Sequence, residues 1–373
     1  MSAGNSFALN FLEILNMKQM RNIFKFHSVL VFALGVFLVP CAFAAGKGVA
    51  YVSNQNGKVT IIDLEIMETK SEINVGAQGP RGLGVTADGK WLITANKGDS
   101  NISIVDTSGA SAPRLVNIGK NPEFVRILGD RAYVTYEPSS TGGPPSKSNK
   151  AEEKEEDDDD DKIPGHIAIV DIKQGKVLMD IVGKPETEGL EFSKDGKKMI
   201  VTNESDNSIT VHDIKSGKLL KSISVGKYGE RPRGVKVSPD GKTYLVTLEL
   251  SDKMLVLNQK FKVIKEVPTG KTPYGVSYDR EGKRIFVAAN NEKTLQVFDA
   301  KTFEKIKDIP TGQRCWHFTF TPDDQQLLLA CGKSSEVIVV DASSLEVTKR
   351  IPANEMPWGI VTYPKSMGSV DQP

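Results

Sequence analysis

One short segment of the 373-residue chain gathers side chains that could bind a metal or form a redox pair. It reads Arg314-Cys315-Trp316-His317, and Cys331 follows it later in the chain. Two thiolates and one imidazole are suitable ligands for Cu(I) or Zn²⁺. The spacing is not a standard zinc motif, so this interpretation competes with a disulfide between the two cysteines and with a pair of free thiols in a core.

The elements around these residues favour the disulfide. A turn signal at Asp323 separates two apolar runs, which predicts strands over 317–321 and 327–331. Cys315 and Cys331 are symmetric about that turn, so they should be cross-strand neighbours with Cβ atoms about 4.5–5.5 Å apart. A disulfide needs a somewhat shorter separation, about 3.5–4.5 Å, and an oxidising compartment favours it. We therefore expect a disulfide and leave the metal assignment open.

A second group of candidate side chains recurs directly after a loop proline or its equivalent, with glutamates at a neighbouring loop position. Arginines could hold an anionic group through paired hydrogen bonds, and aromatic rings could stack on a flat ligand. The glutamates could orient the arginines or bind a cation. The competing interpretation is structural, with rings that pack between repeats and arginines that neutralise glutamates. The nine residues expected to form a ligand site are Arg81, Arg233, Tyr274, Trp316, His317, Trp358, Glu123, Glu204 and Glu249.

These candidates belong to a sequence that repeats itself. The steps between successive landmark aspartates are 43, 65, 42, 86 and 42 residues, and the step of 86 spans a copy with Asn258 instead. Removing an insertion of about 23 residues from the step of 65 restores a period near 42, the size of one propeller blade. The landmark, an apolar strand that ends in aspartate, occurs at Asp63, Asp106, Asp171, Asp213, Asp299 and Asp341.

Each repeat contains four short apolar stretches that predict strands. In one copy they lie at 234–238, 243–248, 254–257 and 263–267, where valine, isoleucine, tyrosine and threonine dominate. An Asp-Gly turn joins the first two stretches, and glycine tolerates the positive φ that a tight hairpin requires.

The two ends of the repeat region complete each other. It opens on a second strand at 49–53 and closes on a first strand at 359–363. The last strand can therefore supply the inner strand of the N-terminal blade, which removes an open sheet edge. We predict an all-β fold over 45–373: a seven-bladed β-propeller with four antiparallel strands per blade, closed by a C-terminal inner strand that joins the N-terminal blade.

Alternating strand direction decides which loops meet. The loops that enter the inner strands should share one face with the loops that leave the second strands. The nine candidate residues would then surround the mouth of the central channel, with aromatic residues on one side and carboxylates on the other. The opposite face carries short, repetitive Pro-Asp-Gly-Lys turns and is expected to be structural.

The stretches YVSN, ITAN and VTNE, together with the VG-x-x-P-x-G turns, resemble the YVTN family of β-propeller repeats. The resemblance covers roughly residues 48–364. Within that family the chain is most similar to periplasmic propellers associated with PQQ-dependent alcohol catabolism, and more distantly it resembles the d1-haem propeller of nitrite reductase. The resemblance implies a periplasmic seven-bladed ring without a fixed reaction, because this motif specifies fold more strongly than function.

The N-terminus predicts a targeting segment. Basic residues precede an apolar core of 12 residues, too short to span a bilayer comfortably, and Ala42-Phe43-Ala44 matches a cleavage site. Residues 1–44 therefore predict a signal peptide, whose true start could be Met17 or Met20. An uncleaved anchor and lipidation at Cys41 are the alternatives. In each case the folded part should lie outside the cytoplasm. With cleavage after Ala44 we expect a periplasmic or secreted protein, monomeric and without a transmembrane span once mature.

Residues 138–164 predict a disordered acidic insertion within the third repeat. Serine, glycine and proline give way to nine acidic residues between Glu152 and Asp161. Such a segment buries too little apolar surface to offset its ordering entropy. It lacks the spaced oxygens and the turn glycine of an EF-hand loop, so we interpret it as a solvated tether, with weak cation binding and docking on a basic partner as alternatives.

Composition and motifs exclude several classes of function. A chain that is 39% hydrophobic and 25% charged is ordinary for a globular protein, and a net charge of +1 gives no reason to expect specific nucleic-acid binding. No Gly-x-Ser-x-Gly, P-loop, His-Glu-x-x-His or Rossmann motif occurs, and the lack of Cys-x-x-Cys-His excludes covalent c-type haem. After residue 44 the histidines are His166, His212 and His317, and only His317 is placed to ligate a channel cofactor.

We therefore expect a binding or accessory protein without a cofactor. Its partner would be a small anionic or aromatic ligand or a periplasmic protein, and the resemblance suggests support of PQQ-dependent alcohol or one-carbon oxidation. The alternatives are a cofactor-holding redox propeller of the d1-haem type and a lactonase-like hydrolase that uses His317 with a glutamate. A further alternative is a ring that binds an extracellular polymer or single-stranded nucleic acid.

Overall fold

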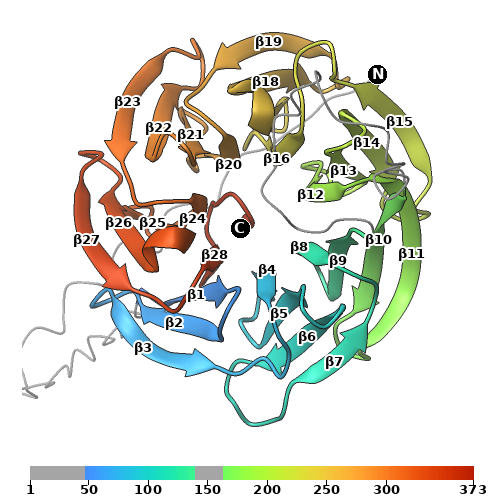
Figure 1. Ribbon diagram of the computed structural model, residues 1–373, viewed down its shortest axis with the longest axis vertical. Helices are drawn as coiled ribbons and strands as arrows, with labels where there is room; N and C mark the ends of the chain where they lie inside the picture. Colours follow the sequence, from blue (N-terminus) through green and yellow to red (C-terminus); the bar gives the residue numbers. More distant parts are fainter. Residues whose placement is uncertain (1–46, 139–162) are drawn as a thin grey trace, which may run out of the picture. The chain divides into compact units, whose positions relative to one another are not determined.

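The computed structural model describes residues 47–138 and 163–373, which form seven four-stranded antiparallel sheets arranged in a ring (Figure 1). The signal peptide expected at 1–44, and nearly all of the acidic insertion expected at 138–164, lie outside these described residues. The seven-bladed propeller predicted from the repeats is confirmed.

Each blade consists of four strands that follow one another from the inner to the outer edge of its sheet. Blade 1 is β28 (Pro357–Tyr363), β1 (Val49–Asn54), β2 (Val59–Asp63) and β3 (Glu68–Ile73). Blade 2 is β4 (Pro80–Val85), β5 (Trp91–Asn96), β6 (Asn101–Asp106) and β7 (Arg114–Asn117). Blade 3 is β8 (Pro122–Leu128), β9 (Arg131–Tyr136), β10 (Pro164–Asp171) and β11 (Lys176–Pro185). Blade 4 is β12 (Thr187–Phe192), β13 (Lys198–Asn203), β14 (Ser208–Asp213) and β15 (Leu219–Ser224).

Blade 5 is β16 (Pro232–Val237), β17 (Thr243–Leu248), β18 (Lys253–Asn258) and β19 (Val263–Pro268). Blade 6 is β20 (Pro273–Tyr278), β21 (Arg284–Ala289), β22 (Thr294–Asp299) and β23 (Lys305–Pro310). Blade 7 is β24 (Cys315–Phe320), β25 (Gln326–Cys331), β26 (Glu336–Asp341) and β27 (Val347–Pro352). The single-turn 3₁₀ helices η2 (Glu249–Ser251) and η3 (Gly332–Ser334) follow β17 and β25.

Blade 1 closes the ring as expected from the strand count. β28 pairs antiparallel with β1, with Tyr363 opposite Val49 and Val361 opposite Tyr51. The two ends of the repeat region are therefore joined in one sheet, and β1 is not left as an unpaired edge.

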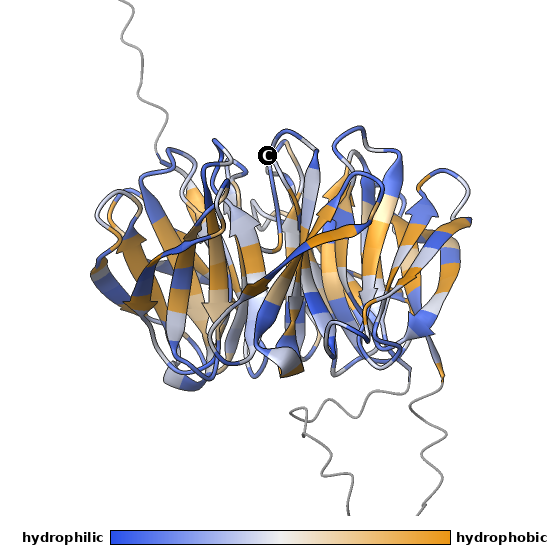
Figure 2. Ribbon diagram, turned by 90° about the horizontal axis from the view of Figure 1, so that it is seen from above, coloured by the Kyte–Doolittle hydropathy of each residue, from blue (hydrophilic) through white to orange (hydrophobic). Residues whose placement is uncertain are grey.

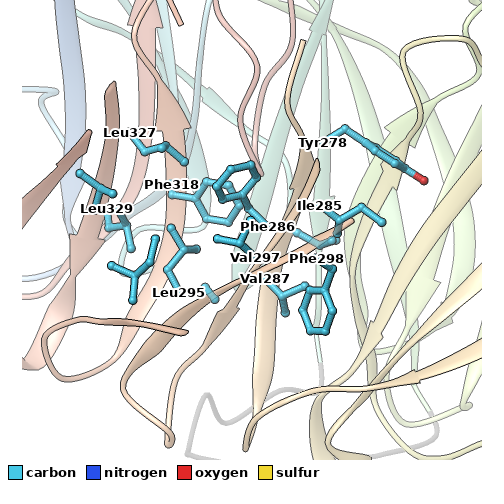
Figure 3. Packing of buried hydrophobic residues seen from close by; sticks show 14 of the residues in the cluster. Tyr278, Ile285, Phe286, Val287, Leu295, Val297, Phe298, Phe318, Leu327 and Leu329 are labelled. Carbon is cyan, nitrogen blue, oxygen red and sulfur yellow. The ribbon is translucent and has the colours of Figure 1, made fainter. Parts of the chain in front are cut away.

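The hydrophobic core lies between neighbouring blades. Between blades 6 and 7, Phe286 contacts Phe320 edge-to-face with ring centroids 5.2 Å apart, and Leu327 and Leu329 pack beside them (Figure 3). These side chains are at most 1% exposed. The strands carry alternating hydrophobic and hydrophilic bands (Figure 2), because successive side chains of a strand point to opposite faces of its sheet.

The repeat aspartates have a structural role in the hairpins between the third and outer strands. The Asp341 carboxylate accepts backbone N–H groups of Ser344 at 2.7 Å and Ser343 at 3.0 Å. These hydrogen bonds lower the pKa of Asp341 to about 2. The same arrangement recurs at Asp299, so this landmark marks a turn rather than a site.

A hydroxyl group on the second strand joins neighbouring inner strands. The Thr202 hydroxyl accepts the Gly189 N–H at 2.9 Å and donates to the Arg233 carbonyl of the next blade at 2.7 Å. A Cβ atom on Gly189 would lie 2.2 Å from that carbonyl oxygen, so the position requires glycine. The Thr247 hydroxyl repeats the pattern between blades 5 and 6. These threonine and glycine positions of the repeat therefore connect the inner strands of neighbouring blades.

The C-terminal segment after β28 enters the centre of the ring (Figure 1). Its Met367 carbonyl accepts the Phe320 N–H at 2.7 Å, and the Ser369 N–H donates to the Phe318 carbonyl at 2.9 Å. Val370 is 1% exposed and Asp371 is 5% exposed. No sequence pattern had predicted a segment in the channel.

Candidate functional site

The inner strands share an irregularity that directs side chains to the axis. In all seven blades the pairing of the inner with the second strand shifts register near the first residues of the inner strand. Such bulges re-aim a side chain. The residues that follow the loop proline consequently meet across blades at one end of the channel. We call this cluster the channel mouth; it comprises Arg81, Lys97, Glu123, Glu137, Glu186, Glu188, Glu204, Arg231, Arg233, Glu249, Tyr274, His317 and Trp358.

Arg233 is the centre of the charged half of the mouth. Its guanidinium donates to Glu188 and Glu249, each at 3.1 Å, and it also pairs with Glu204. It donates to the Tyr274 hydroxyl and lies 4.1 Å from the centroid of that ring. Arg233 is 9% exposed, so these are buried, charge-assisted contacts.

Two further bases of the mouth, Arg81 and Lys97, pair with the same glutamate. Arg81 pairs with Glu123, whose other oxygen accepts from Lys97 at 3.3 Å. Arg81 also lies over the Trp358 ring, 4.9 Å from its centroid. The predicted meeting of the two loop sets at one face is thus observed, and the arginines pair with glutamates there.

Arg231 is a member of the mouth that was not among the predicted residues. It pairs with Glu186 at 2.9 Å and with Glu204. It comes two residues before Arg233 and precedes the loop proline, so the repeat position did not mark it.

His317 lies among aromatic rings at the axis. Its ring centroid is 4.4 Å from Trp358 and 5.2 Å from Tyr274. Nδ1 lies 3.0 Å from the Ser369 hydroxyl of the C-terminal segment, whereas Nε2 has no hydrogen-bond partner among the described residues. Burial, with Arg233 and Arg81 nearby, lowers the pKa of His317 well below its ordinary value. The imidazole is therefore neutral at pH 7.

Trp316 belongs to the same buried hydrophobic cluster as Tyr274 and Trp358. Its ring covers Gly332, where an added Cβ atom would lie 1.9 Å from a ring carbon. Arg314 is 5.7 Å from the ring centroid. Trp316 therefore packs over η3, and among the described residues it has no hydrogen bond to the charged groups of the mouth.

The buried carboxyl groups of the mouth differ in pKa. Burial raises the pKa of Glu137 well above its usual value, and the neighbouring Glu188 and Glu123 carboxylates add to the effect. Burial also raises the pKa of Glu204 well above its usual value, against the attraction of Arg233 and Arg231. For Glu188, burial is opposed by Arg233 and Arg81, and its pKa is lowered. Burial therefore outweighs the attraction of the arginines at Glu204, whereas the arginines outweigh burial at Glu188.

Little space remains at the axis. A cavity of about 10 Å³ lies beneath the mouth, lined by residues that include Glu188, Arg233, Tyr274 and His317. That volume holds about one water molecule. A larger, open groove of about 430 Å³ lies on the opposite face, between turns of blades 4 and 5, with lysines and aspartates along it. A ligand larger than water would have to displace side chains of the mouth.

A second charged cluster lies deeper in the channel and was not predicted. Lys236 is 0% exposed, lies 3.4 Å from a Glu191 oxygen, and donates to the Asp371 carbonyl of the C-terminal segment at 2.7 Å. Arg126 also pairs with Glu191. Burial lowers the pKa of Lys236 to about 8, against the opposing effect of Glu191.

Lys236 should make the free energy of unfolding depend on pH in the alkaline range. Between about pH 8 and pH 10.5, the unfolded chain holds a proton on this lysine that the folded chain has lost. The free energy of unfolding should therefore rise with pH across this window, by about 3 kcal/mol. Urea unfolding of the wild type and of Lys236→Met at a series of pH values isolates the effect, and a difference between them that stays constant with pH would contradict it.

The two cysteines of blade 7 lie opposite each other in the register of β24 and β25, and their sulfur atoms are joined. The bond closes the bulged start of β24 onto the end of β25. His317 points to the axis, with its ring among Tyr274, Trp358 and Phe124 rather than beside the sulfurs.

Thiol titration tests the disulfide directly. The chain from residue 45 onward contains Cys315 and Cys331 and no other cysteine. Unfolded, unreduced mature protein should therefore show about zero free thiols, and reduced protein two. Two free thiols before reduction would exclude the disulfide. If a bound metal rather than a disulfide masked the thiols, a chelator would restore them without reduction.

The other two histidines lie away from the mouth. His212 on β14 is 2% exposed and its Nδ1 lies 3.2 Å from the Gly217 carbonyl, in agreement with a structural role. His166 stacks on Tyr136 and its Nδ1 lies 3.0 Å from Asp180, so it is partly buried and paired.

Comparison with known families gives two partial matches. A family model described as the cytochrome D1 heme domain matches residues 251–363, and one described as lactonase, 7-bladed beta-propeller, matches residues 171–260. The first segment contains Tyr274, His317 and Trp358, and the second contains the Arg233 ion pairs. Each match covers less than a third of the chain. No curated protein gives a significant match.

Several solved structures share the fold. A functionally unknown protein from Desulfotomaculum acetoxidans has a TM-score of 0.69 at 15% identity, covering 84% of this chain and 98% of that one. A hydrazine synthase from Kuenenia stuttgartiensis has a TM-score of 0.66 at 19% identity, covering 79% and 93%. A putative 6-phosphogluconolactonase from Bacteroides uniformis has a TM-score of 0.67 at 17% identity, covering 85% and 99%. At these identities the likeness concerns fold alone, and the chain is a seven-bladed β-propeller.

Proposed function

We propose that this protein is a periplasmic binding or accessory propeller rather than an enzyme. The observation that carries the proposal is that the arginines of the channel mouth are already paired with its glutamates. Arg233 holds three carboxylates and a tyrosine hydroxyl, and Arg81 holds Glu123 beneath a tryptophan ring. Groups engaged in this way form a rigid, preorganised surface, whereas a catalytic group needs access to a reacting atom.

The ligand that suits the mouth is anionic or aromatic, or is a protein that presents such groups. Arg231 and Lys97, with side chains 20% and 22% exposed, are the most accessible bases of the mouth. An incoming carboxylate could exchange with their glutamate partners. Support of PQQ-dependent alcohol or one-carbon oxidation rests on the family resemblance alone.

Native mass spectrometry of protein isolated from its own source tests the proposal. We expect a bound small molecule or partner protein that is absent after heterologous expression. Arg231→Gln should release it, whereas Arg350→Gln, a change in an exposed pair on β27, should not. Recovery of the unliganded polypeptide alone from both sources would count against a binding function.

The residues at the axis do not fit a d1 haem. Trp358 and Tyr274 are buried at the mouth, the C-terminal segment lies in the channel, and the cavity of about 10 Å³ is far smaller than a macrocycle. His317, the histidine that lies at the axis among the described residues, is enclosed by three aromatic rings. We therefore derive no redox step through such a group; a colourless protein from its native source is expected.

A lactonase-like hydrolase is the second candidate, because a lactonase model matches residues 171–260 and His317 shares the small cavity with Glu188. A neutral imidazole next to a one-water cavity could act as a general base once the mouth opens. Turnover across a panel of lactones that disappears in His317→Gln but persists in His212→Gln would favour this candidate.

A further inference from the structure

The channel mouth contains more acidic than basic side chains. Six carboxyl groups face four bases within the part of the chain that the structure describes, so two carboxyl groups have no counter-charge when all six are ionised, and the raised pKa values of Glu137 and Glu204 reflect this shortage. The carboxyl groups are Glu123, Glu137, Glu186, Glu188, Glu204 and Glu249, and the bases are Arg81, Lys97, Arg231 and Arg233. Uncompensated charge is costly in a buried site.

Glu137 is the carboxyl group that lacks a base. It is 4% exposed, and its Oε1 has no hydrogen-bond partner among the described residues. Its backbone is nevertheless fixed: the N–H donates to the carbonyls of Lys120 and Asn121 at 3.2 and 3.1 Å, and the Asn121 side chain donates to its carbonyl at 3.0 Å. The main chain therefore holds an unpartnered buried carboxyl group against two others.

The three carboxyl groups are arranged as ligands would be. Glu123, Glu137 and Glu188 each offer one oxygen, and these atoms all lie within 4.8 Å of one another. Ca²⁺ binds several carboxylates at once in a flexible geometry, whereas Mg²⁺ is usually bound through one or two carboxylates and keeps several of its waters. Three carboxylates therefore favour Ca²⁺.

We infer that the channel mouth binds one divalent cation, with Ca²⁺ preferred over Mg²⁺, on the carboxylates of Glu123, Glu137 and Glu188. The ion balances the two excess charges. It also connects blade 3, through β8 and the residue after β9, to blade 4, through β12. Water molecules complete its coordination. The inference is independent of the proposed ligand-binding function.

Calorimetric titration of the mature, chelator-treated protein with CaCl₂ and, in parallel, MgCl₂ tests the inference. We expect one Ca²⁺ per chain, with weaker Mg²⁺ binding and a higher Tm in the presence of Ca²⁺. Glu137→Gln keeps the shape and removes the charge, so it should weaken Ca²⁺ binding by at least about tenfold. The same variant should melt at a higher temperature than wild type in chelator, because a glutamine does not have to take up a proton or bury a charge when the chain folds.

Two controls separate this site from other acidic groups. Glu249→Gln changes a mouth carboxylate that belongs to the Arg233 and Arg231 pairs, and it should retain Ca²⁺ binding. A chain without residues 139–162 lacks the acidic run and should also retain it. Absence of Ca²⁺ binding at millimolar concentration, equal affinity in Glu137→Gln, or loss of binding only in the deletion would each overturn the inference, and none of these outcomes would bear on the binding of an organic ligand or protein.

Discussion

Replacing Arg233 by methionine should lower the free energy of unfolding by about 3–5 kcal/mol. The change removes the guanidinium that faces Glu188, Glu204 and Glu249, and three carboxylates would then share a buried site without their main counter-charge. Methionine fills part of the vacated volume, so the lower free energy of unfolding results mainly from the missing positive charge. Urea unfolding at pH 7, followed by circular dichroism, gives the value.

A matched surface variant makes that value interpretable. Arg350→Met breaks an ion pair with Glu336 that is 2.7 Å long, but the Arg350 side chain is 49% exposed. Solvent screening limits such a pair to about 1 kcal/mol or less. Equal losses in the two variants would show that the Arg233 network does not depend on burial, and the mouth could then not be described as preorganised by its buried ion pairs.

The ring was predictable because its signals are local. An Asp-Gly hairpin occurs in three copies and a strand that ends in aspartate in six, with a period near 42 residues between copies. Such signals have a nearby structural cause, such as the N–H groups that Asp341 accepts. Ring closure needed one more step, the count of inner strands, and β28 pairs with β1 as that count required.

The mouth was predictable in outline but not in its pairing. The alternation of strand direction predicted that Arg233 would lie near Glu204 and Glu249, whose positions recur in the repeat, and the structure shows these contacts. It could not reveal that Glu137 lacks a base, because that depends on which side chains reach across blades. Trp316 shows the same limit: it occupies the repeat position of Trp358, yet the glycine at 332 gives its ring a different place to pack.

The C-terminal segment left no pattern to recognise. Residues 364–373 are short, with no strand periodicity and no turn motif of the repeat. Their partners are main-chain and uncharged polar groups of β24 together with Lys236 of β16, and Lys236 would have been the clearest sign. A lysine in the middle of an inner strand predicts a buried acceptor at the axis, and in this protein the acceptor is a main-chain carbonyl of the same chain.

Removing residues 365–373 should therefore destabilise the ring and open its channel. The truncated protein loses the burial of Met367 and Val370, worth about 1.5–3 kcal/mol each before the ordering entropy of the segment is subtracted. Lys236 loses the Asp371 carbonyl, and the Phe318 N–H loses the Ser369 hydroxyl. We expect a net loss of about 2–4 kcal/mol, measured as a fall in Tm by calorimetry.

Removing only Pro373 is the control, because Asp371 then keeps its amide carbonyl as the acceptor of Lys236, and the contacts of Met367, Ser369 and Val370 remain. That variant should melt within about one degree of the wild type, since changes that remove no buried contact have small effects. The longer truncation should also expose Trp358 to small quenchers in solution, because water reaches the axis when the segment is gone. Unchanged Tm and unchanged quenching in the longer truncation would mean that the segment rests in the channel without closing it, and the mouth would then have to be kept dry by its own ion pairs alone.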